Sequence, residues 1–385
     1  MTTVRLPELI LPMTVHAVRD VIADAHANHA PLSITGGSSW QNAGSPVEAT
    51  RTLTLRQLSG ITEYVPGDLT ITARAGTTMA ELAQATAAHG QWLGLDPAGV
   101  REGTIGATIA TASCGPLAHA FGTPRDLVLG LELVTGYGEI VRPGGRVVKN
   151  VAGFDLVRLF TGSWGTLGAL TAVTLRLRAL PVHDVTLAMP VRETSQLSLL
   201  LPALRANTVS LLACEWLDGV TASRLGVGSG DDVFLLRLGG NDRFVRGQRA
   251  VLESIAPCRS VDPATWGAIA ALDAAATAVV RFSGAIGDLP SRMARLRASL
   301  SAAGATASLH ASLGRGIVRV IVTDGVAQCR AVLQTATPGE TRIVERLPEP
   351  WWTTEPDPFA SGLPGRIRTA FDPHLVCNRR RVADA

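Results

Sequence analysis

Two glycine-rich stretches of this chain are suited to holding a large ligand. The first, Ile34-Thr-Gly-Gly-Ser-Ser-Trp40, follows a short apolar segment and holds only small side chains up to Trp40. Consecutive backbone N–H groups without shielding side chains can form a nest for a diphosphate. The spacing matches neither GxxxxGK[ST] nor GxGxxG, so neither a P-loop nor a Rossmann fingerprint is supported. Because glycine turns after strands are common, this loop alone is only a candidate anion site.

The second stretch, Gly103-Thr-Ile-Gly-Ala-Thr-Ile-Ala-Thr-Ala-Ser113, is small throughout except for Ile105 and Ile109. It could form a wall that admits a flat ligand, or simply a tightly packed helix. It lies within residues 94–168, which hold 15 of the 39 glycines. Such crowding is typical of backbone that lies close to a ligand or of repeated tight turns.

Hydrophobic periodicity predicts the elements that position these stretches. Helices are expected over 14–30 and 79–89, and strands over 31–35, 53–55, 69–75 and 169–178. Thr77, with Thr78 as the alternative, is expected to cap the second helix. Pro181 ends the last strand, and a strand–helix–strand pattern then runs to about residue 345. We therefore expect a first domain over 1–181, a smaller α+β cap or substrate domain with an antiparallel sheet over 182–345, and a tail over 346–385 that returns to the first domain.

Composition excludes several classes of function. The net charge is +3 and no long basic run is present, so nucleic-acid binding is not expected. No apolar run reaches the ~18 residues that a transmembrane helix needs, and the N-terminus lacks a signal-peptide layout. The five cysteines form no CxxC pair, which argues against zinc, an iron–sulfur cluster and a disulfide scaffold. We expect a soluble cytoplasmic protein with reduced thiols, with attachment to the inner membrane through partners as a further option.

Further along the chain, Gly122-Thr-Pro-Arg-Asp126 precedes an apolar strand, and residues 146–171 read RVVKNVAGFDLVRLFTGSWGTLGALT. That run resembles the KN-x-x-G-[YF]-D-L … G-S-x-G-x-L-G signature of the glycolate oxidase and D-lactate dehydrogenase branch. In this order, the segments resemble the PCMH-type FAD-binding domain of the vanillyl-alcohol oxidase superfamily. Within the branch, residues 68–181 are most similar to the FAD-binding E-type subunits of glycolate oxidase. The likeness covers about residues 10–181 and returns at Phe371-Asp-Pro373 and Asn378.

The resemblance implies an α+β fold with a two-subdomain PCMH-type FAD-binding domain, and it implies a role for each matching residue. The loop Thr35, Gly36, Gly37, Ser38, Ser39 and Trp40 would hold the FAD pyrophosphate. The ribityl chain and isoalloxazine would be lined by Pro97, Gly103, Thr104, Ile105, Gly106, Thr108 and Ala112. The pocket would be closed by Gly115, Gly122, Arg125 and Asp126. Ile140 would meet the adenine side, and Asn378 would reach back to the flavin ring.

Two departures from the family bear on chemistry. Covalently flavinylated relatives carry a histidine in the pyrophosphate loop, where this chain has Ser38, Ser39 and Trp40, so non-covalent FAD is expected. Hydroxy-acid dehydrogenase relatives carry a metal-binding H-x-G-D-G-N-x-H segment, whose nearest counterpart here is the stretch 310–319. Its second histidine and its acid are absent, so no metal is expected. His310, Arg315 and Arg319 could still bind a substrate carboxylate, because a guanidinium needs no metal to do so. The alternative is that these three side chains lie on a solvated strand face.

Lys149 is the only lysine among 35 basic residues. A compact ammonium differs from a planar guanidinium, and the resemblance implies that this stretch runs beside the flavin. We therefore expect Lys149 to stabilise the reduced flavin, with chance survival of a surface lysine as the alternative.

The function that follows is an FAD-binding subunit of a glycolate oxidase-like 2-hydroxy-acid dehydrogenase. A catalytic flavoprotein subunit and an iron–sulfur subunit are its expected partners, because this chain has no cluster ligands. One alternative is a stand-alone FAD-linked oxidase or dehydrogenase of another 2-hydroxy acid or alcohol. Another is a scaffold subunit without turnover.

Overall fold

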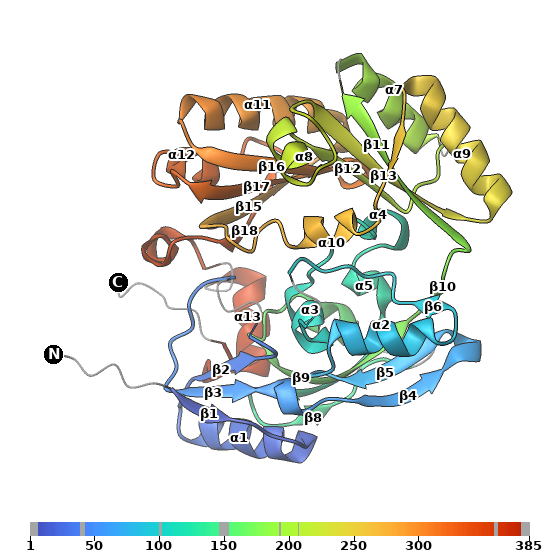
Figure 1. Cartoon of the computed structure of the whole chain (residues 1–385). Coiled ribbons are helices and arrows are strands. Elements are labelled where there is room, and N and C mark those ends of the chain that lie inside the picture. The colour runs from blue at the N-terminus through green and yellow to red at the C-terminus, as the bar shows by residue number, and fades with distance from the viewer. Residues whose placement is uncertain are drawn as a thin grey trace. The chain divides into compact units, whose positions relative to one another are not determined.

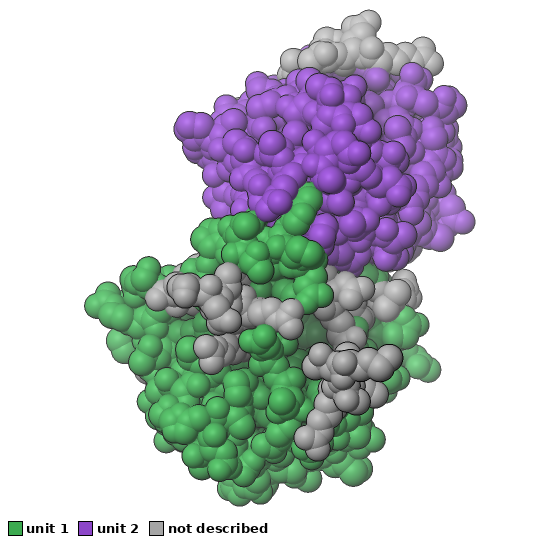
Figure 2. All heavy atoms as spheres, turned by 90° about the vertical axis from the view of Figure 1, so that its left-hand side faces the viewer, with its two compact units in different colours: residues 1–114, 122–180, 349–385 green, residues 115–121, 181–348 purple. Residues whose placement is uncertain are grey.

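The computed structural model describes residues 7–38, 43–99, 102–145, 154–191, 194–206, 208–357 and 361–378. The chain divides into two compact units, coloured separately in Figure 2. Unit 1 comprises residues 1–114, 122–180 and 349–385, and unit 2 comprises residues 115–121 and 181–348. Unit 1 is therefore built from sequence on both sides of unit 2.

Among its described residues, unit 1 contains three sheets. The largest is antiparallel with the order β4-β5-β9-β7-β8. A parallel three-stranded sheet has the order β1-β3-β2, and β10 pairs with β6. The strands are β1 Glu8–Ile10, β2 Leu32–Thr35, β3 Arg51–Thr54, β4 Ile61–Val65, β5 Thr70–Arg74, β6 Gln91–Trp92, β7 Val128–Thr135, β8 Ile140–Val141, β9 Gly168–Arg176 and β10 Arg178–Ala179.

The helices of unit 1 begin where the sequence supplies a cap. Thr14 accepts a hydrogen bond from Ala17 N at 3.1 Å at the start of α1 (Val15–Ala27). Thr78, the alternative that we considered for the second helix, forms a full capping box with Glu81 at α2 (Met79–Ala87). The remaining helices are α3 Ile105–Thr111, α5 Pro124–Leu127, α6 Leu156–Phe160 and α13 Gly362–Phe371.

The end of the chain completes the core around the parallel sheet. Val376 and Cys377 are fully buried in one apolar cluster with Ile22 of α1, Leu32 of β2 and Leu53 of β3. Leu32 N donates to the carbonyl of Val376 at 2.8 Å. The tail therefore packs as part of this sheet's core.

Unit 2 is built on one antiparallel sheet with the order β14-β11-β13-β12-β16-β17-β15-β18. Figure 1 shows α7, α9 and α11 on one side of this sheet and α10 on the other. The strands are β11 His183–Val191, β12 Ala213–Leu217, β13 Asp232–Gly240, β14 Arg259–Val261, β15 Ala278–Ser283, β16 Thr306–Ser312, β17 Ile317–Asp324 and β18 Thr341–Arg346. The helices are α4 Ala118–Phe121, α7 Thr194–Arg205, α8 Gly219–Arg224, α9 Asp242–Ile255, α10 Thr265–Ala270, α11 Leu289–Ala302 and α12 Arg330–Gln334. None of the helices within the described ranges is long and apolar enough to cross a lipid bilayer.

A buried ion pair fastens α11 to the segment that leads into β18. Arg292 Nε lies 2.9 Å from Glu340 Oε1, and Arg295 contacts Oε2 of the same carboxylate at 2.7 Å. Burial alone would raise the pKa of Glu340, but hydrogen bonds from Thr337, Arg295 and Arg292 outweigh it. They lower the pKa from 4.5 to about 2.

We expect Glu340→Gln to lower the free energy of unfolding by about 3 kcal/mol at pH 7, because it leaves the buried Arg292 without its counter-ion. A depressed pKa means that the stabilisation is present above about pH 4.5 and is lost as the pH falls towards 2. Urea unfolding at pH 7 and pH 3 measures the difference. Glu253→Gln, which breaks an exposed pair on α9, should change stability by less than about 0.5 kcal/mol. An equal loss for Glu340→Gln at both pH values would contradict this account.

Candidate functional site

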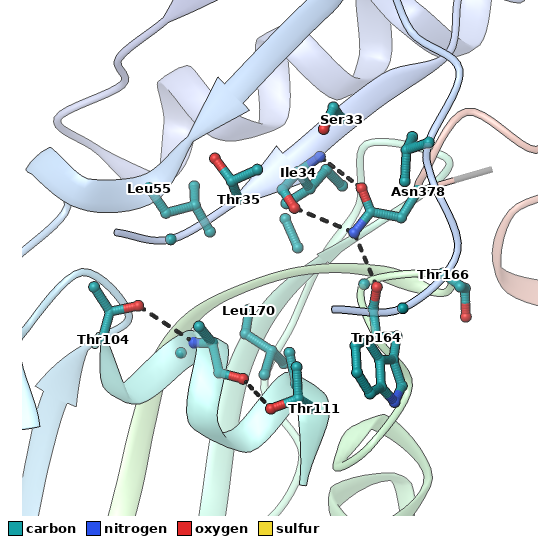
Figure 3. A pocket seen from close by; sticks show the side chains of 18 of the residues that line it. Ser33, Ile34, Thr35, Leu55, Thr104, Thr111, Trp164, Thr166, Leu170 and Asn378 are labelled. Atoms are coloured by element: carbon teal, nitrogen blue, oxygen red, sulfur yellow. Dashed lines mark hydrogen bonds between the residues drawn. The ribbon is translucent and has the colours of Figure 1, made fainter. Parts of the chain in front are cut away.

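A cavity of about 500 Å³ lies inside unit 1, between the end of β2, helix α3 and the start of β9 (Figure 3). Small residues (Gly, Ala, Ser, Thr) make up most of its walls. The lining residues are 33–36, 38, 43–47, 55, 75, 104, 106, 107, 110, 111, 164–166, 168–170 and 378.

The loop after β2 forms one wall. The Thr54 hydroxyl donates to the carbonyl of Gly36 at 2.9 Å, and Ser38 takes a left-handed conformation with φ +63°. A Cβ built at Gly36 would overlap Thr104 Oγ1, whereas one at Gly37 would lie 3.4 Å from its nearest neighbours. Gly36 is therefore required for the close approach of this loop to α3. Ser39 and Trp40, predicted to belong to the same loop, lie outside the described residues.

Helix α3 forms the opposite wall. The stretch 103–113 is therefore both a tightly packed helix and a wall of the cavity, the two alternatives that the sequence left open. It is a tightly packed helix whose Ile105 and Ile109 are fully buried. Its other face, with Gly106 and Ala107, lines the cavity. Thr104 caps the helix by accepting from Ala107 N at 3.4 Å (Figure 3). The small residues therefore leave room on the cavity side while the isoleucines hold the helix to the core.

The third wall is the segment 164–170, which sequence reasoning did not include among the site residues. Trp164 and Gly165 both have positive φ, +57° and +70°, and Trp164 N donates to the carbonyl of Ala110 at 2.8 Å. The Trp164 ring covers Gly44, where a Cβ would lie 3.0 Å from the ring. The sequence did contain one indication of this wall. Gly162, Gly165 and Gly168 are closely spaced, and such spacing indicates unusual backbone conformations.

Asn378 joins two of these walls. Its side-chain oxygen accepts from Ile34 N at 2.6 Å, and its amide nitrogen donates to the carbonyls of Ile34 at 3.1 Å and Trp164 at 2.9 Å (Figure 3). Both amide hydrogens are thus used within the protein. Asn378 lines the cavity, and its amide donors clamp β2 to the segment at Trp164, while its expected contact with the flavin ring stays a prediction.

Six of the predicted cofactor residues line the cavity: Thr35, Gly36, Ser38, Thr104, Gly106 and Asn378. The others within the described ranges do not. These are Gly37, Pro97, Gly103, Ile105, Thr108, Ala112, Gly115, Gly122, Arg125, Asp126 and Ile140.

Several of these residues that do not line the cavity have an evident structural task. The Thr108 hydroxyl donates to the carbonyl of Thr104 at 3.1 Å. Asp126 accepts from Thr123 N at 2.8 Å in a capping box at α5, and Arg125 Nε donates to the carbonyl of Thr161 at 3.3 Å. Ile140 packs against the apolar cluster that includes α1.

In unit 2 the three residues predicted to bind a substrate carboxylate, His310, Arg315 and Arg319, do not form one binding site. Arg319 is held by Glu345 at 2.6 Å and Asp273 at 2.9 Å. Burial alone would lower the pKa of this guanidinium, but the two carboxylates raise it above its ordinary value. Because both carboxylates bind the guanidinium, Arg319 is not available to a substrate, and the expected contact is corrected on that ground.

The alternative of a solvated strand face is wrong as well. His310 is only 5% exposed, and the Arg319 side chain is 13% exposed. Arg315 lies half-buried in the turn after β16 and has partners of its own. Lys149 lies outside the described residues. Within the described ranges, no group of three or more His, Cys, Asp or Glu side chains is placed to hold a metal ion.

The cavity in unit 1 fits a flavin nucleotide. Gly36, Gly44 and Gly165 are positions where a Cβ would press on a neighbouring wall, so side chains are absent where the walls approach closely. Thr35, Ser38, Thr104 and Thr111 offer hydroxyl groups among apolar walls such as Leu55 and Leu170. An apolar slot with few polar groups is the usual form of a cofactor site.

Comparison with known proteins identifies the class. Residues 7–144 match the family described as an FAD binding domain, and this part of the chain is accordingly an FAD-binding domain. Three of the segments that line the cavity, around β2, at Ala75 and in α3, lie within the matched residues.

The particular relatives are oxidoreductases of 2-hydroxy acids. Glycolate oxidase subunit GlcE of Escherichia coli (strain K12) is 38% identical over 172 residues, which are 44% of this chain and 49% of that protein. Glycolate oxidase subunit GlcD of Bacillus subtilis (strain 168) is 32% identical over 180 residues, which are 46% of this chain and 38% of that protein. The chain thus spans about half, or less, of the length of these relatives.

Solved structures extend the likeness of fold to the whole chain. A substrate-bound p-cresol methylhydroxylase superposes with a TM-score of 0.76 at 14% identity, covering 97% of this chain and 88% of that one. An alkyldihydroxyacetonephosphate synthase gives 0.73 at 15% identity, covering 97% and 76%. The predicted α+β fold of the PCMH type and the predicted resemblance are confirmed.

We expect Gly36→Ala to weaken FAD binding roughly 100-fold, equivalent to about 2.7 kcal/mol, because the added methyl group must displace Thr104 or the loop. Titration of the FAD-free chain with FAD, followed by flavin fluorescence, measures the affinity. Gly67→Ala is the matched control, since a Cβ there meets nothing within 4 Å and φ is not positive. Unchanged affinity in Gly36→Ala would place the cofactor elsewhere.

Replacing Asn378 by Asp exchanges two donated hydrogen bonds for repulsion between a carboxylate and two carbonyl oxygens. We expect the free energy of unfolding of the FAD-free chain to fall by about 2–3 kcal/mol and FAD to bind more weakly. Chemical unfolding and FAD titration measure both effects. Asn28→Asp, which alters a side chain at the exposed end of α1, should lower stability by less than about 1 kcal/mol. Comparable losses in the two variants would refute the clamp.

Proposed function

We propose that this chain is the FAD-binding subunit of a glycolate oxidase-like dehydrogenase that oxidises a small 2-hydroxy acid. One observation carries the proposal. Two walls of the small-residue cavity, the loop after β2 and helix α3, lie in the part of the chain that matches an FAD binding domain, and glycolate oxidase subunits are among the proteins similar to this chain. Bound FAD supplies the acceptor for a hydride, which none of the chain's own side chains can provide.

We assign the protein's own part in flavin binding as follows. Backbone N–H groups of the loop at Gly36 and Ser38, which line the cavity, hold the pyrophosphate. The face of α3 that carries Gly106 and Ala107 receives the ring system. Asn378 keeps the cavity walls together. The closely packed walls exclude water from the reacting edge of the flavin.

We propose that the FAD is held non-covalently. The cavity-lining residues described here include no His, Cys or Tyr side chain, and these are side chains whose nucleophilic atoms could form a bond to a flavin. Residues 39–42 of the same loop, Ser-Trp-Gln-Asn, supply none either.

In unit 2, His310 and the nearby Arg315 are our candidate contacts to the substrate carboxylate. Arg319 is not a candidate, because Glu345 and Asp273 bind its guanidinium. Because this chain has no evident cluster ligands, we propose that electrons pass on to a catalytic flavoprotein subunit and an iron–sulfur subunit. The free thiols of Cys214, Cys258, Cys329 and Cys377 support a reducing, cytoplasmic location. A stand-alone FAD-linked dehydrogenase of another 2-hydroxy acid or alcohol is the second candidate, since 97% of this chain, both units included, shares its fold with a p-cresol methylhydroxylase chain.

We expect the purified chain to be yellow, to release all its flavin on acid precipitation, and to bleach only slowly with glycolate under anaerobic conditions. The slow bleaching follows from the absence of a metal cluster that could orient the substrate carboxylate, within the described residues. Addition of catalytic and iron–sulfur subunits of glycolate oxidase should accelerate it. Fast bleaching by the chain alone would favour the stand-alone enzyme, and flavin that stays with the precipitate would disprove non-covalent binding.

A further inference from the structure

Three histidine rings, called the histidine cluster below, meet at the surface of unit 1. His26 lies in the last turn of α1, and His29 follows that helix in a left-handed conformation with φ +51°. The ring centroid of His374 lies 4.5 Å from that of His26 and 3.9 Å from that of His29. His374 thus contacts both rings, although it comes from a distant part of the sequence.

The segment that carries His374 also carries Asn378. We call residues 372–378 the closing segment. Leu32 N donates to the carbonyl of Val376 at 2.8 Å, and Asn378 N donates to the carbonyl of Leu32 at 3.2 Å. The Asn378 side chain then holds two walls of the cavity together. A displacement of the closing segment would therefore reach the cavity.

A single buried carboxylate fixes the shape of the closing segment. Asp372 is fully buried, and its two oxygens accept hydrogen bonds from Val376 N at 2.9 Å and Cys377 N at 2.8 Å. Burial raises the pKa of Asp372, whereas these hydrogen bonds and the charges of Arg368 and His26 oppose the rise. One carboxylate can offset one imidazolium charge, but the histidine cluster contains three rings.

The surroundings of His374 disfavour its protonated form. Loss of hydration among the packed rings lowers the pKa of His374 below its ordinary value of 6.5, and the nearby His29 and His26 lower it further. Asp372 acts in the opposite direction. Tyr137 lies against the cluster, with its ring centroid 5.2 Å from that of His26, but a phenol carries no charge at neutral or acid pH.

The sign of the pH dependence follows from this depressed pKa. A displaced, hydrated His374 ring takes up a proton near pH 6.5, whereas the docked ring resists it. Docking of the closing segment is therefore fully favourable above pH 6.5 and weakens as the pH falls below it. Ring distances of 3.9 and 4.5 Å are well below the screening length of ~8 Å at physiological ionic strength, so salt leaves much of the repulsion in place.

Resting on the flavin site proposed above, we propose that the histidine cluster is a pH sensor for FAD binding. As the pH falls, protons from solvent charge the rings one after another. The imidazolium groups repel one another and push the closing segment away from α1. The Asn378 clamp then loosens, and the cavity holds FAD less tightly.

The first test is titration of the FAD-free, full-length chain with FAD at pH 7.5 and pH 5.5 and constant ionic strength. We expect affinity about fivefold weaker at pH 5.5, the equivalent of the repulsion between two charges ~4 Å apart in water. In the double variant His29→Asn with His374→Gln, only one ring of the cluster can be charged, so the change should be less than about twofold. Asparagine is chosen at position 29 because it tolerates the left-handed conformation.

His16→Gln is the matched control, because His16 is exposed in the first turn of the same helix. It should keep the full pH dependence of the unmodified chain. The titrations of Asp372 and of FAD itself are common to all these variants, so they cancel in the comparison. Equal pH dependence in the unmodified chain and the double variant would overturn the inference.

A second readout follows the closing segment in the absence of FAD. Cys377 is fully buried, so its thiol reacts with 4,4′-dithiodipyridine only when the segment leaves its place. At pH 5.5 we expect faster labelling of Cys377 in the unmodified chain than in the double variant, as located by peptide mapping. Cys329, which is buried in unit 2, is the internal control and should react equally in both.

The outcome is separable from that of the proposed function. A chain that binds no FAD would refute the proposed function, while the labelling of Cys377 would still decide whether the histidine cluster moves the closing segment. A chain that binds FAD, but in which labelling differs between the variants and FAD affinity does not, would refute the pH sensor and leave the flavin assignment standing.

Discussion

One side-chain amide holds together two walls of the cavity in unit 1. Asn378 has a hydrogen-bond donor group and an acceptor, and it uses both on backbone groups of Ile34 and Trp164. These two segments are far apart in sequence and share no strand pairing. Gly165 permits the contact, because a Cβ there would lie 2.6 Å from the Asn378 amide nitrogen. The hydrogen bonds of Asn378 and the missing side chain at Gly165 therefore fix how closely these two walls approach each other.

Unit 2 shows two ways of burying charge on one face of a sheet. His310 pairs in register with Arg319, and Arg319 with Arg281. Arg319 is satisfied by Glu345 and Asp273, so that cluster is self-contained and serves stability. Next to it, His310 Nε2 lies 2.6 Å from Glu215 Oε2, and this pair keeps unpartnered atoms. Buried polar groups that stay unsatisfied are more typical of sites than of cores.

Local pattern was enough to predict much of the fold and part of the site. The alternation over 69–75 and 169–178 became β5 and β9, and the small-residue stretch at 103–113 became α3. Hydrophobic periodicity could not show which residues that are far apart in the sequence contact each other in the fold. The contacts of Asn378 with Ile34 span 344 residues, and the partners of Arg319 come from separate strands and loops. The left-handed conformation of Trp164 was equally hidden, because a non-glycine residue gives little local signal for it.

Unit 1 is assembled from residues on both sides of unit 2 in the sequence. Its cavity can therefore be completed only after most of unit 2 has been synthesised. During synthesis, residues 7–180 emerge first, but β2 lacks Val376 and the cavity lacks Asn378 until the chain has reached residue 378. At ribosomal rates of roughly 5–20 residues per second, about 10–40 s separate these two events. In that interval the apolar edge formed by Leu32 and Ile22 is uncovered. Nascent chains are thus exposed to chaperones and proteases before a flavin-competent cavity exists, and cofactor loading is confined to molecules whose synthesis has passed that point.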